Sequence, residues 1–222
     1  VTPGTAINDK LLDNRTNNFL ASLSLGEHKH GIAFLDLSTG EFLCTEGNTE
    51  FIDKLLQSFR PSEVIFQKQR GKQFRELFGE KYYTYGLDEW LFSESYATDI
   101  LLQHFQTVSL KGFGVDDLPD AIIAAGAAIH YLKDTEHSQL AHIGNLQRIT
   151  EGDFLWMDRF TIHNLELLDS PREGGQTLLQ VLDNTVTPMG SRLMRRWLLF
   201  PLQDLHQIQD RLDVVEFTMK HA

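Results

Sequence analysis

The chain has 222 residues and a formal net charge of -11 at pH 7, and 41% of its residues are hydrophobic. This length and composition suit one large domain or two small ones with a substantial core. A protein that binds DNA by neutralising phosphates needs a positive surface, so the acidic balance argues against strong independent binding of duplex DNA. No run of about 18 apolar residues occurs, and no transmembrane helix is expected.

The N-terminal sequence VTPGTAINDK has neither an initiator Met nor the basic-then-apolar pattern of a signal peptide. We therefore expect the chain to be a piece of a larger protein. Its single cysteine, Cys44, excludes an internal disulfide and fits a reducing compartment, so a cytoplasmic location is expected. Cys44 lies in a strand-like segment, which favours an inert core thiol.

The first part of the chain alternates predicted strands and helices. A mixed segment at 17–25 leads into a strand, and the segment 31–47 contains two apolar runs separated by Ser38, Thr39 and Gly40, as in a β-hairpin. Apolar spacing then predicts, in chain order, a helix at 49–59, a strand at 62–67, a helix at 70–79, a strand at 81–86, a helix at 91–108 and a helix at 119–136. This is the order of an α/β domain whose first two strands are antiparallel.

The helix predicted at 119–136 begins at Pro119, a residue well suited to a first helical turn. Its centre contains little side-chain bulk, because it consists of Ala124, Ala125, Gly126, Ala127 and Ala128. We therefore expect this helix to lie very close to a sheet.

The pattern changes at about residue 142. Two short strands are predicted at 142–150 and 153–158, another element begins at 161, and 170–176 is a turn-rich loop. Three helices are then predicted at 177–185, 187–200 and 204–221. Asp204 is a suitable N-cap for the last of them.

Asp36 is the residue whose position best fits a catalytic site. It lies in a strand before a hairpin, where ribonuclease H-like folds present a metal-binding carboxylate, and two-metal phosphoryl transfer needs several carboxylates around ions about 4 Å apart. The nearby acidic residues Glu41, Glu63 and Asp88 give no recognisable second and third ligand. The alternative, which we favour, is that Asp36 caps the following turn through an Asx-type hydrogen bond.

The histidines and glycines do not form a recognisable ligand set. His28 and His30 flank a lysine without a third ligand at metal-binding spacing. The other candidate histidines are scattered, so a zinc site is not expected: His130, His137, His142 and His163. The segment KGFGV lacks the Lys-Ser/Thr of a phosphate-binding loop.

The helix predicted at 187–200 has a basic face formed by Arg192, Arg195 and Arg196. A second face is apolar and consists of Met189, Leu193, Trp197 and Phe200. The favoured interpretation is a packed helix whose arginines pair with acids on the next helix, such as Asp210 or Asp213. The alternative is contact with nucleic-acid phosphates.

Several segments resemble the MutS family of DNA mismatch-repair proteins, in family order and over nearly the whole chain. They are VTPGTAINDKLLDNRTNNFLA, GIAFLDLSTGEF, GFGVDDLPDAIIAAGAAIHYLKDTE, FLWMDRFTIHNLEL and TLLQVLDNTVTPMGSRLMRRWLLFPLQDL. The resemblance implies a ribonuclease H-like α/β connector domain at 1–138, followed by the N-terminal part of the mainly helical core, or lever, domain at 139–222. The position of His163 often holds arginine in the family.

The resemblance also implies a function. The connector and lever couple the ATPase and DNA-binding ends of the family protein without catalysing a reaction, and the connector offers a docking surface for a MutL-type protein. The family's N-terminal domain with its mismatch-reading Phe-x-Glu motif, the clamp and the Walker loop are absent from this sequence. ATP, magnesium, mismatched DNA and a homodimeric state are therefore expected for the full-length protein, and this segment is expected to be non-enzymatic, with no cofactor and little DNA contact. The alternative is a divergent metal-dependent nuclease that uses Asp36.

We expect the partner to dock on the helix predicted at 91–108. Its apolar stripe faces inward and its polar residues outward, with Leu101, Leu102 and Phe105 opposite Asp99, Gln103 and Gln106. Ile100 and His104 flank the boundary, where a histidine that charges near neutral pH would suit reversible docking. The predicted partner-binding residues are Ile100, Gln103 and His104, and the alternative for Ile100 is a place in the core.

Overall fold

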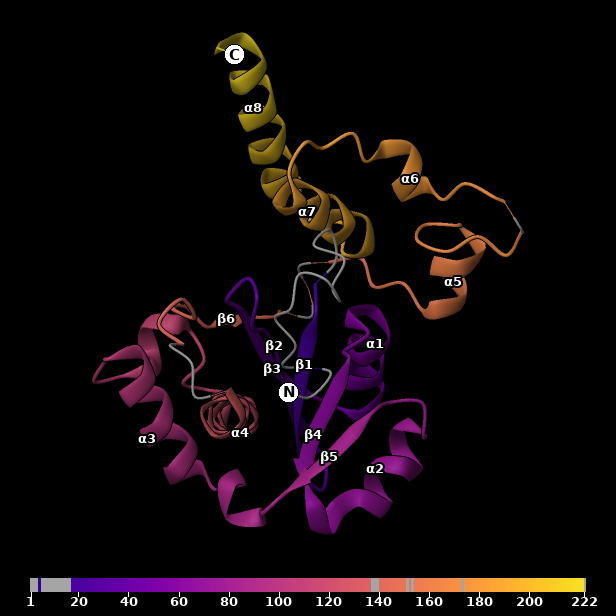
Figure 1. Ribbon diagram of the computed structural model, residues 1–222. Helices are drawn as coiled ribbons and strands as arrows, with labels where there is room; N and C mark the ends of the chain where they lie inside the picture. Colours follow the sequence, from indigo (N-terminus) through magenta and orange to yellow (C-terminus); the bar gives the residue numbers. More distant parts are fainter. Residues whose placement is uncertain are drawn as a thin grey trace. The chain divides into compact units, whose positions relative to one another are not determined.

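The computed structural model describes Gly4 and the residues 17–136, 140–150, 152, 154–172 and 174–221. The chain forms two compact units, Val1–Ile149 and Thr150–Ala222 (Figure 1). Among the described residues, no helix is both long enough and apolar enough to cross a membrane. The domain boundary that we expect after residue 138 stays a prediction.

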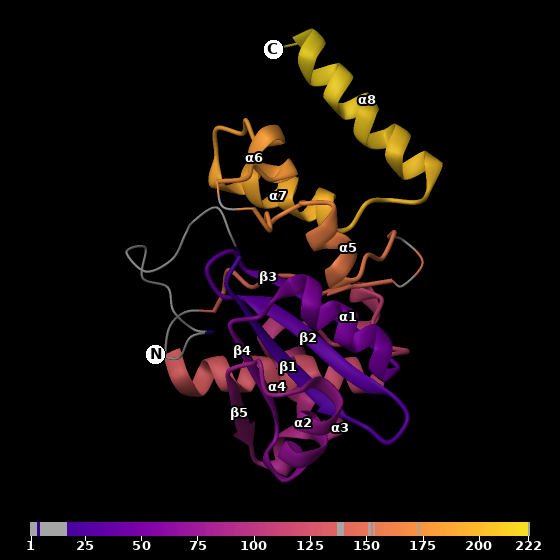
Figure 2. The same ribbon diagram turned by 90° about the vertical axis from the view of Figure 1, so that its right-hand side faces the viewer.

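A six-stranded mixed sheet forms the centre of the first unit (Figure 2). Its strands are β1 (Phe19–Leu25), β2 (His30–Asp36), β3 (Glu41–Gly47), β4 (Glu63–Gln67), β5 (Thr84–Leu87) and β6 (Gln147–Arg148). In space the order is β5-β4-β1-β2-β3-β6. The first three strands form an antiparallel meander, β4 and β5 continue parallel to β1, and β6 is parallel to β3.

Helices cover both faces of this sheet (Figure 1). One face carries α1 (Thr49–Phe59) and α2 (Gly71–Phe78), and the other carries α4 (Pro119–Glu136), with α3 (Glu94–Phe105) packed against α4. Because successive side chains of a strand point to opposite faces of the sheet, they pack against the helices on opposite faces. Leu20 lies in the core under α4, whereas the ring of Phe34 stacks at 4.3 Å on that of Phe59 in α1.

The close approach of α4 to the sheet confirms the prediction made from its small residues. Ala121, Ala124, Ala125 and Ala128 are fully buried in the core that α4 shares with the sheet. Gly31 of β2 lies so near α4 that a Cβ atom there would be 1.9 Å from the carbonyl oxygen of Asp120. Gly126 serves a different contact, since a Cβ atom there would lie 2.5 Å from Ala97 of α3.

The hairpin, α1, β4 and α4 lie where the sequence predicts them. β5 begins later than predicted, and the helix predicted at 91–108 is divided. A 3-10 turn, η3 (Glu89–Phe92), precedes α3, and Ser93 between them has extended backbone with φ -90° and ψ 139°. The helix then ends at Gln106, whose φ of 51° is left-handed. Two further 3-10 turns are η2 (Lys68–Arg70) and η4 (Leu110–Phe113).

Cys44 occupies the core position that its sequence context indicates. The thiol is buried in β3 under α4. Burial raises its pKa to about 12, so the reactive thiolate is scarcely populated near neutral pH. Cys44 is therefore an inert core residue.

The second unit is mainly helical, as expected. Its helices are α5 (Arg159–Asn164), α6 (Leu178–Leu182), α7 (Pro188–Leu199) and α8 (Leu205–His221). Local capping explains their starts: Thr177 and Gln180 form a capping box at α6, and Thr187 caps α7 with proline at the first position. Asp204 accepts a hydrogen bond from the Gln207 amide at 2.9 Å, which confirms it as the cap of α8.

The strands predicted at the start of this region are largely wrong. The segment 142–150 contributes only the two-residue strand β6 to the sheet of the first unit. In the described part of 153–158, Phe154 forms an isolated bridge with Leu202 and no strand. The rings of Phe154, Trp156 and Phe200 pack edge to face instead, so the apolar residues of this segment build an aromatic cluster.

The contact between Gly31 and α4 is testable. Gly31→Ala is expected to lower the free energy of unfolding by about 2 kcal/mol or more, because over-packing a close contact typically costs ~1–3 kcal/mol. Urea denaturation of the 222-residue chain would measure the change. Gly112→Ala is the matched control, since a Cβ atom there meets nothing within 4 Å. Equal stabilities of the two variants would contradict the close approach.

Candidate functional site

Asp36 is the last residue of β2 and is completely buried. Its Oδ1 atom accepts hydrogen bonds from the Ser38 amide at 2.9 Å, the Ser38 hydroxyl at 2.6 Å and the Thr39 amide at 3.3 Å. The Gly40 amide donates to the Asp36 carbonyl at 2.9 Å. The favoured interpretation, an aspartate that caps the hairpin turn, is confirmed.

The other carboxylate oxygen of Asp36 is also occupied. Oδ2 accepts from the Asn17 side chain at 2.8 Å and from the Asn18 amide at 3.3 Å, and the same Asn17 side chain donates to Glu41 at 3.2 Å. Asp36 also lies at the end of β2, the second strand along the chain. Because donors occupy both oxygens, Asp36 does not fit a metal site.

Glu63 does not supply a second metal ligand either. It is buried at the start of β4, where one oxygen accepts from the Tyr131 hydroxyl at 2.7 Å and the other from the Gly4 amide at 3.0 Å. Within the described parts of the chain, no group of three or more His, Cys, Asp or Glu side chains is placed to hold a metal ion. His137 lies outside the described residues.

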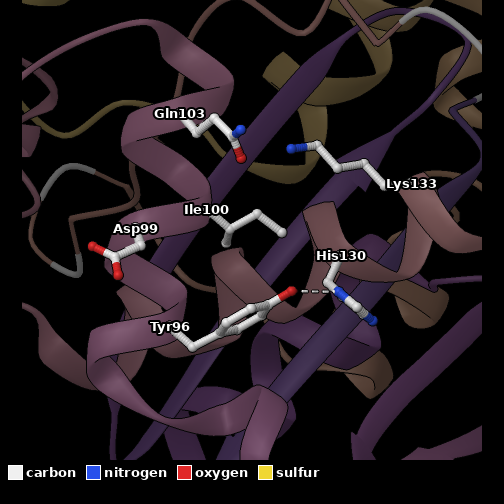
Figure 3. Close-up of a pocket in the computed structure, with 6 residues that line it drawn as sticks. All are labelled: Tyr96, Asp99, Ile100, Gln103, His130 and Lys133. Atoms are coloured by element: carbon white, nitrogen blue, oxygen red, sulfur yellow. Dashed lines mark hydrogen bonds between the residues drawn. The ribbon is translucent and has the colours of Figure 1, made fainter.

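A pocket with a volume of about 500 Å³ lies between α3 and α4 (Figure 3). It is lined from α3 by Tyr96, Asp99, Ile100 and Gln103, and from α4 by His130 and Lys133. Figure 3 shows Ile100 in the middle, with the Gln103 and Lys133 side chains on one side and the Tyr96–His130 pair on the other. The Tyr96 hydroxyl and His130 Nδ1 are 2.6 Å apart. The pocket thus combines an apolar floor with polar walls.

The predicted partner-binding residues lie on α3 but not as the sequence indicates. Ile100 is only 7% exposed and belongs to the core under α4, so the alternative stated for Ile100, a place in the core, is confirmed. Gln103 is exposed at the pocket. His104 is half-buried, with Nε2 2.8 Å from the Ile143 carbonyl, and burial lowers its pKa. Sequence reasoning missed His130 and Lys133, because they join the pocket only through tertiary packing.

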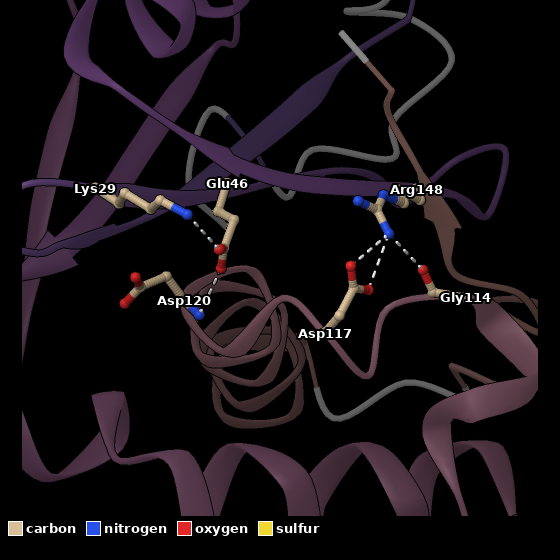
Figure 4. A network of polar contacts seen from close by, with 6 residues as sticks. All are labelled: Lys29, Glu46, Gly114, Asp117, Asp120 and Arg148. Atoms are coloured by element: carbon tan, nitrogen blue, oxygen red, sulfur yellow. Dashed lines mark hydrogen bonds and ion pairs between the residues drawn. The ribbon is translucent and has the colours of Figure 1, made fainter.

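A polar network fixes the start of α4 to the sheet (Figure 4). Glu46 of β3 accepts from the Asp120 amide at 3.1 Å and lies 3.6 Å from the Lys29 ammonium. A carboxylate is favourable at this end of a helix because the helix dipole is positive there. Arg148 of β6 donates to both carboxylate oxygens of Asp117, at 2.9 and 3.0 Å. Burial and the charge of Glu46 raise the pKa of Asp120.

The helices α7 and α8 of the second unit meet through an aromatic ring. The Arg211 guanidinium carbon lies 4.4 Å from the centre of the Trp197 ring, a cation–π contact. Burial and the charge of Arg196 lower the pKa of Arg211. On the apolar face of α7, Phe200 is buried but Met189 is 72% exposed. The expected pairing of the basic face with Asp210 or Asp213 stays a prediction.

Comparison with known proteins agrees with this architecture. The family model for MutS domain II matches residues 18–144, and the model for MutS domain III matches residues 160–222. The DNA mismatch repair protein MutS of Christiangramia forsetii is 52% identical over 100% of this chain, and that of Cytophaga hutchinsonii is 50% identical, also over 100%. The protein of the same name from Bacteroides fragilis is 50% identical over 98%. The chain belongs to the MutS family.

These relatives are much longer than this chain, which covers 25% of the Christiangramia forsetii protein and 26% of the Cytophaga hutchinsonii protein. Among solved structures, a fowlpox virus resolvase in complex with Holliday junction DNA aligns with 51% of this chain at a TM-score of 0.35 and 11% identity. A score that low carries no argument about fold or function.

The structural role of Asp36 makes a prediction about stability. Asp36→Ala is expected to lower the free energy of unfolding by about 2–4 kcal/mol, because each buried donor left unsatisfied costs ~1–3 kcal/mol. Asp99→Ala, at an exposed position, is the control. With Mg²⁺ present, neither wild type nor variant is expected to cleave DNA. Cleavage by the wild type that disappears in a stably folded Asp36→Ala variant would restore the nuclease alternative.

Acid should destabilise the first unit through three histidines that are buried or half-buried. Burial lowers the pKa of His30, His104 and His130 below the value of about 6.5 that they have when unfolded. The unfolded state therefore binds more protons, so the free energy of unfolding should be highest above pH 6.5 and fall as the pH drops below it.

Urea denaturation at pH 7.5, 6.5 and 5.5 would measure this dependence on pH. His104→Gln, whose amide can still donate to the Ile143 carbonyl, should reduce the loss of stability on acidification. His28→Gln, at an exposed position, should leave it unchanged. The same acid sensitivity in the wild type and in His104→Gln would exclude His104 as a source.

Proposed function

We propose that this chain is the connector and the first part of the core of a DNA mismatch-repair protein. In this role it couples the ATPase and DNA-binding ends of the full-length protein without catalysing a reaction itself. The observation that carries the proposal is that the models for two consecutive MutS domains match the two compact units in order. The hydrogen bonds that occupy both oxygens of Asp36 support a non-catalytic role.

We also infer that the first unit is a ribonuclease H-like domain. The order β5-β4-β1-β2-β3, with an antiparallel meander followed by two parallel strands, supports this assignment. Helices on both faces of the sheet are consistent with it.

The ligands of the full-length protein lie mainly outside this segment. The chain has no Walker loop, so ATP and magnesium would bind elsewhere, and its net charge of -11 supports little direct contact with mismatched DNA. The homodimeric state that we expect likewise belongs to the full-length protein. A lone buried thiol, Cys44, fits the reducing cytoplasm.

We propose the surface of α3 and α4 around the pocket as the docking site for the MutL-type partner. Docking sites combine a small apolar cavity with polar groups that fix orientation. Here Ile100 forms the floor, Gln103 and Lys133 form part of the wall, and His104 lies on the next turn of α3. This retains the three residues of the sequence prediction and adds the α4 side of the site.

Gln103 is the residue to change, because Ile100 belongs to the core. Gln103→Arg in the full-length protein is expected to weaken binding of the MutL-type partner tenfold or more, since a longer charged side chain would obstruct the pocket; tenfold corresponds to about 1.4 kcal/mol. Biolayer interferometry would measure the dissociation constant.

Gln69→Arg is the matched control, because Gln69 is exposed in η2, the turn directly before α2, and α2 covers the face of the sheet opposite α4. It should bind the partner as the wild type does. Unchanged binding by a folded Gln103→Arg variant would exclude this surface as the docking site.

A further inference from the structure

Trp90 presents an exposed aromatic ring beside the pocket. It lies in η3 and is 56% exposed, although the two residues that follow it, Leu91 and Phe92, are buried. Its ring centre lies 5.0 Å from that of Tyr96 and 5.7 Å from that of His130, with interplanar angles of 73° and 76°. The buried neighbours and the two flanking rings fix Trp90 in place while leaving much of its surface open.

The ring and the pocket form one continuous surface. Tyr96 and His130, which contact Trp90, are also two of the residues that line the pocket around Ile100 (Figure 3). We call Trp90, Tyr96, Ile100 and His130 the Trp90 surface. Tryptophan is enriched among the residues that dominate binding at protein interfaces, usually beside a pocket that excludes water.

The segment that carries Trp90 is acidic. From residue 88 to residue 110 the chain has no lysine or arginine and four acidic residues, all of them exposed: Asp88, Glu89, Glu94 and Asp99. On α4, the neighbouring charges of Lys133 and Asp134 offset each other. An exposed aromatic ring on an acidic segment attracts a cation, through the ring quadrupole and through the charges.

The second unit already contains the same chemistry. Arg211 lies over the ring of Trp197 at 4.4 Å, so this chain uses an arginine on a tryptophan to join two of its own helices. A guanidinium suits such a site better than an ammonium, because it is planar and more weakly hydrated.

We propose that the Trp90 surface binds an arginine side chain of a docking partner over the Trp90 ring, with Glu89 and Glu94 as counter-charges. An adjacent apolar side chain of the partner occupies the pocket over Ile100. This inference rests on the proposed docking function and specifies its chemistry: the partner contributes a cationic segment, which the acidic surface attracts.

A titration with argininamide tests the cation site without the partner. In the ¹⁵N-labelled 222-residue chain, the indole N–H signal of Trp90 is expected to shift and saturate with argininamide. Citrullinamide, in which a neutral urea of the same shape replaces the guanidinium, should shift it less than one third as far. The signals of Trp156 and Trp197 serve as internal references. Equal shifts with the two compounds, or no shift at all, would overturn the proposal.

A charge variant tests whether the acidic residues are needed for the shift of the Trp90 signal with argininamide. Glu89→Gln/Glu94→Gln keeps the size of both side chains and should reduce the argininamide shift at least threefold. Glu76→Gln/Glu80→Gln, on the opposite face of the sheet, should leave it unchanged. An undiminished shift in Glu89→Gln/Glu94→Gln would also overturn the proposal.

Partner binding separates this inference from the docking function itself. In the full-length protein, Trp90→Leu and Glu89→Gln/Glu94→Gln should each weaken binding of the MutL-type partner tenfold or more, whereas Trp90→Phe should retain part of the affinity. If Gln103→Arg weakens binding and the Trp90 and glutamate variants do not, docking stands and the arginine contact is wrong. If argininamide binds as expected and no variant on α3 affects the partner, the docking function is wrong and the cation site stands.

Discussion

The contact between α4 and the sheet determines where the other elements of the first unit can lie. Gly31 of β2 leaves no room for a side chain beneath the Asp120 carbonyl, and four alanines of α4 form its buried face. The other side of α4 also meets α3 closely, because Gly126 lies against Ala97. Interiors packed at this density transmit small displacements. The register of α3 on α4 therefore follows from residues without bulk, and it places Tyr96 beside His130 at the pocket.

The buried carboxylates of the first unit follow a common pattern. Asp36 ends β2 and Glu63 begins β4 at the same end of the sheet, whereas Glu46 pairs with Gly31 near the opposite end. Each accepts hydrogen bonds from backbone amides or hydroxyls. A buried carboxylate must be satisfied by donors or by a cation, and donors that are fixed in the fold leave no oxygen for a metal. Asp36, which suggests an enzyme in the sequence, therefore closes a turn, and Glu46 anchors α4.

Local patterns in the sequence predict those elements whose structure is determined locally. The Ser38-Thr39-Gly40 turn, the apolar spacing of α1 and the proline at the start of α4 each specify an element within a few residues. The pocket depends on residues more than thirty positions apart, such as Tyr96 and His130, and no local period contains that information. Ile100 shows the same limit, since its place on α3 is clear from periodicity but its burial depends on how α4 packs. The aromatic cluster of Phe154, Trp156 and Phe200 has the composition of a strand, but ring packing takes the place of strand pairing.

α4 contributes to two features that matter for the proposed function: the polar contacts at its start and the pocket at its later turns. Its start is bound to β3 through Glu46, and the loop before it is bound through Asp117 to Arg148 of β6, the last strand before the boundary of the two units. Its later turns carry His130 and Lys133 to the pocket. An α-helix rises 1.5 Å per residue, so the 18 residues of α4 extend over about 27 Å as one rigid element. A core substitution that moved α4 would alter both features at once and could not separate docking from coupling. Exposed positions such as Trp90, Glu94 and Gln103 can separate them, because they change the surface while α4 keeps its contacts with the sheet.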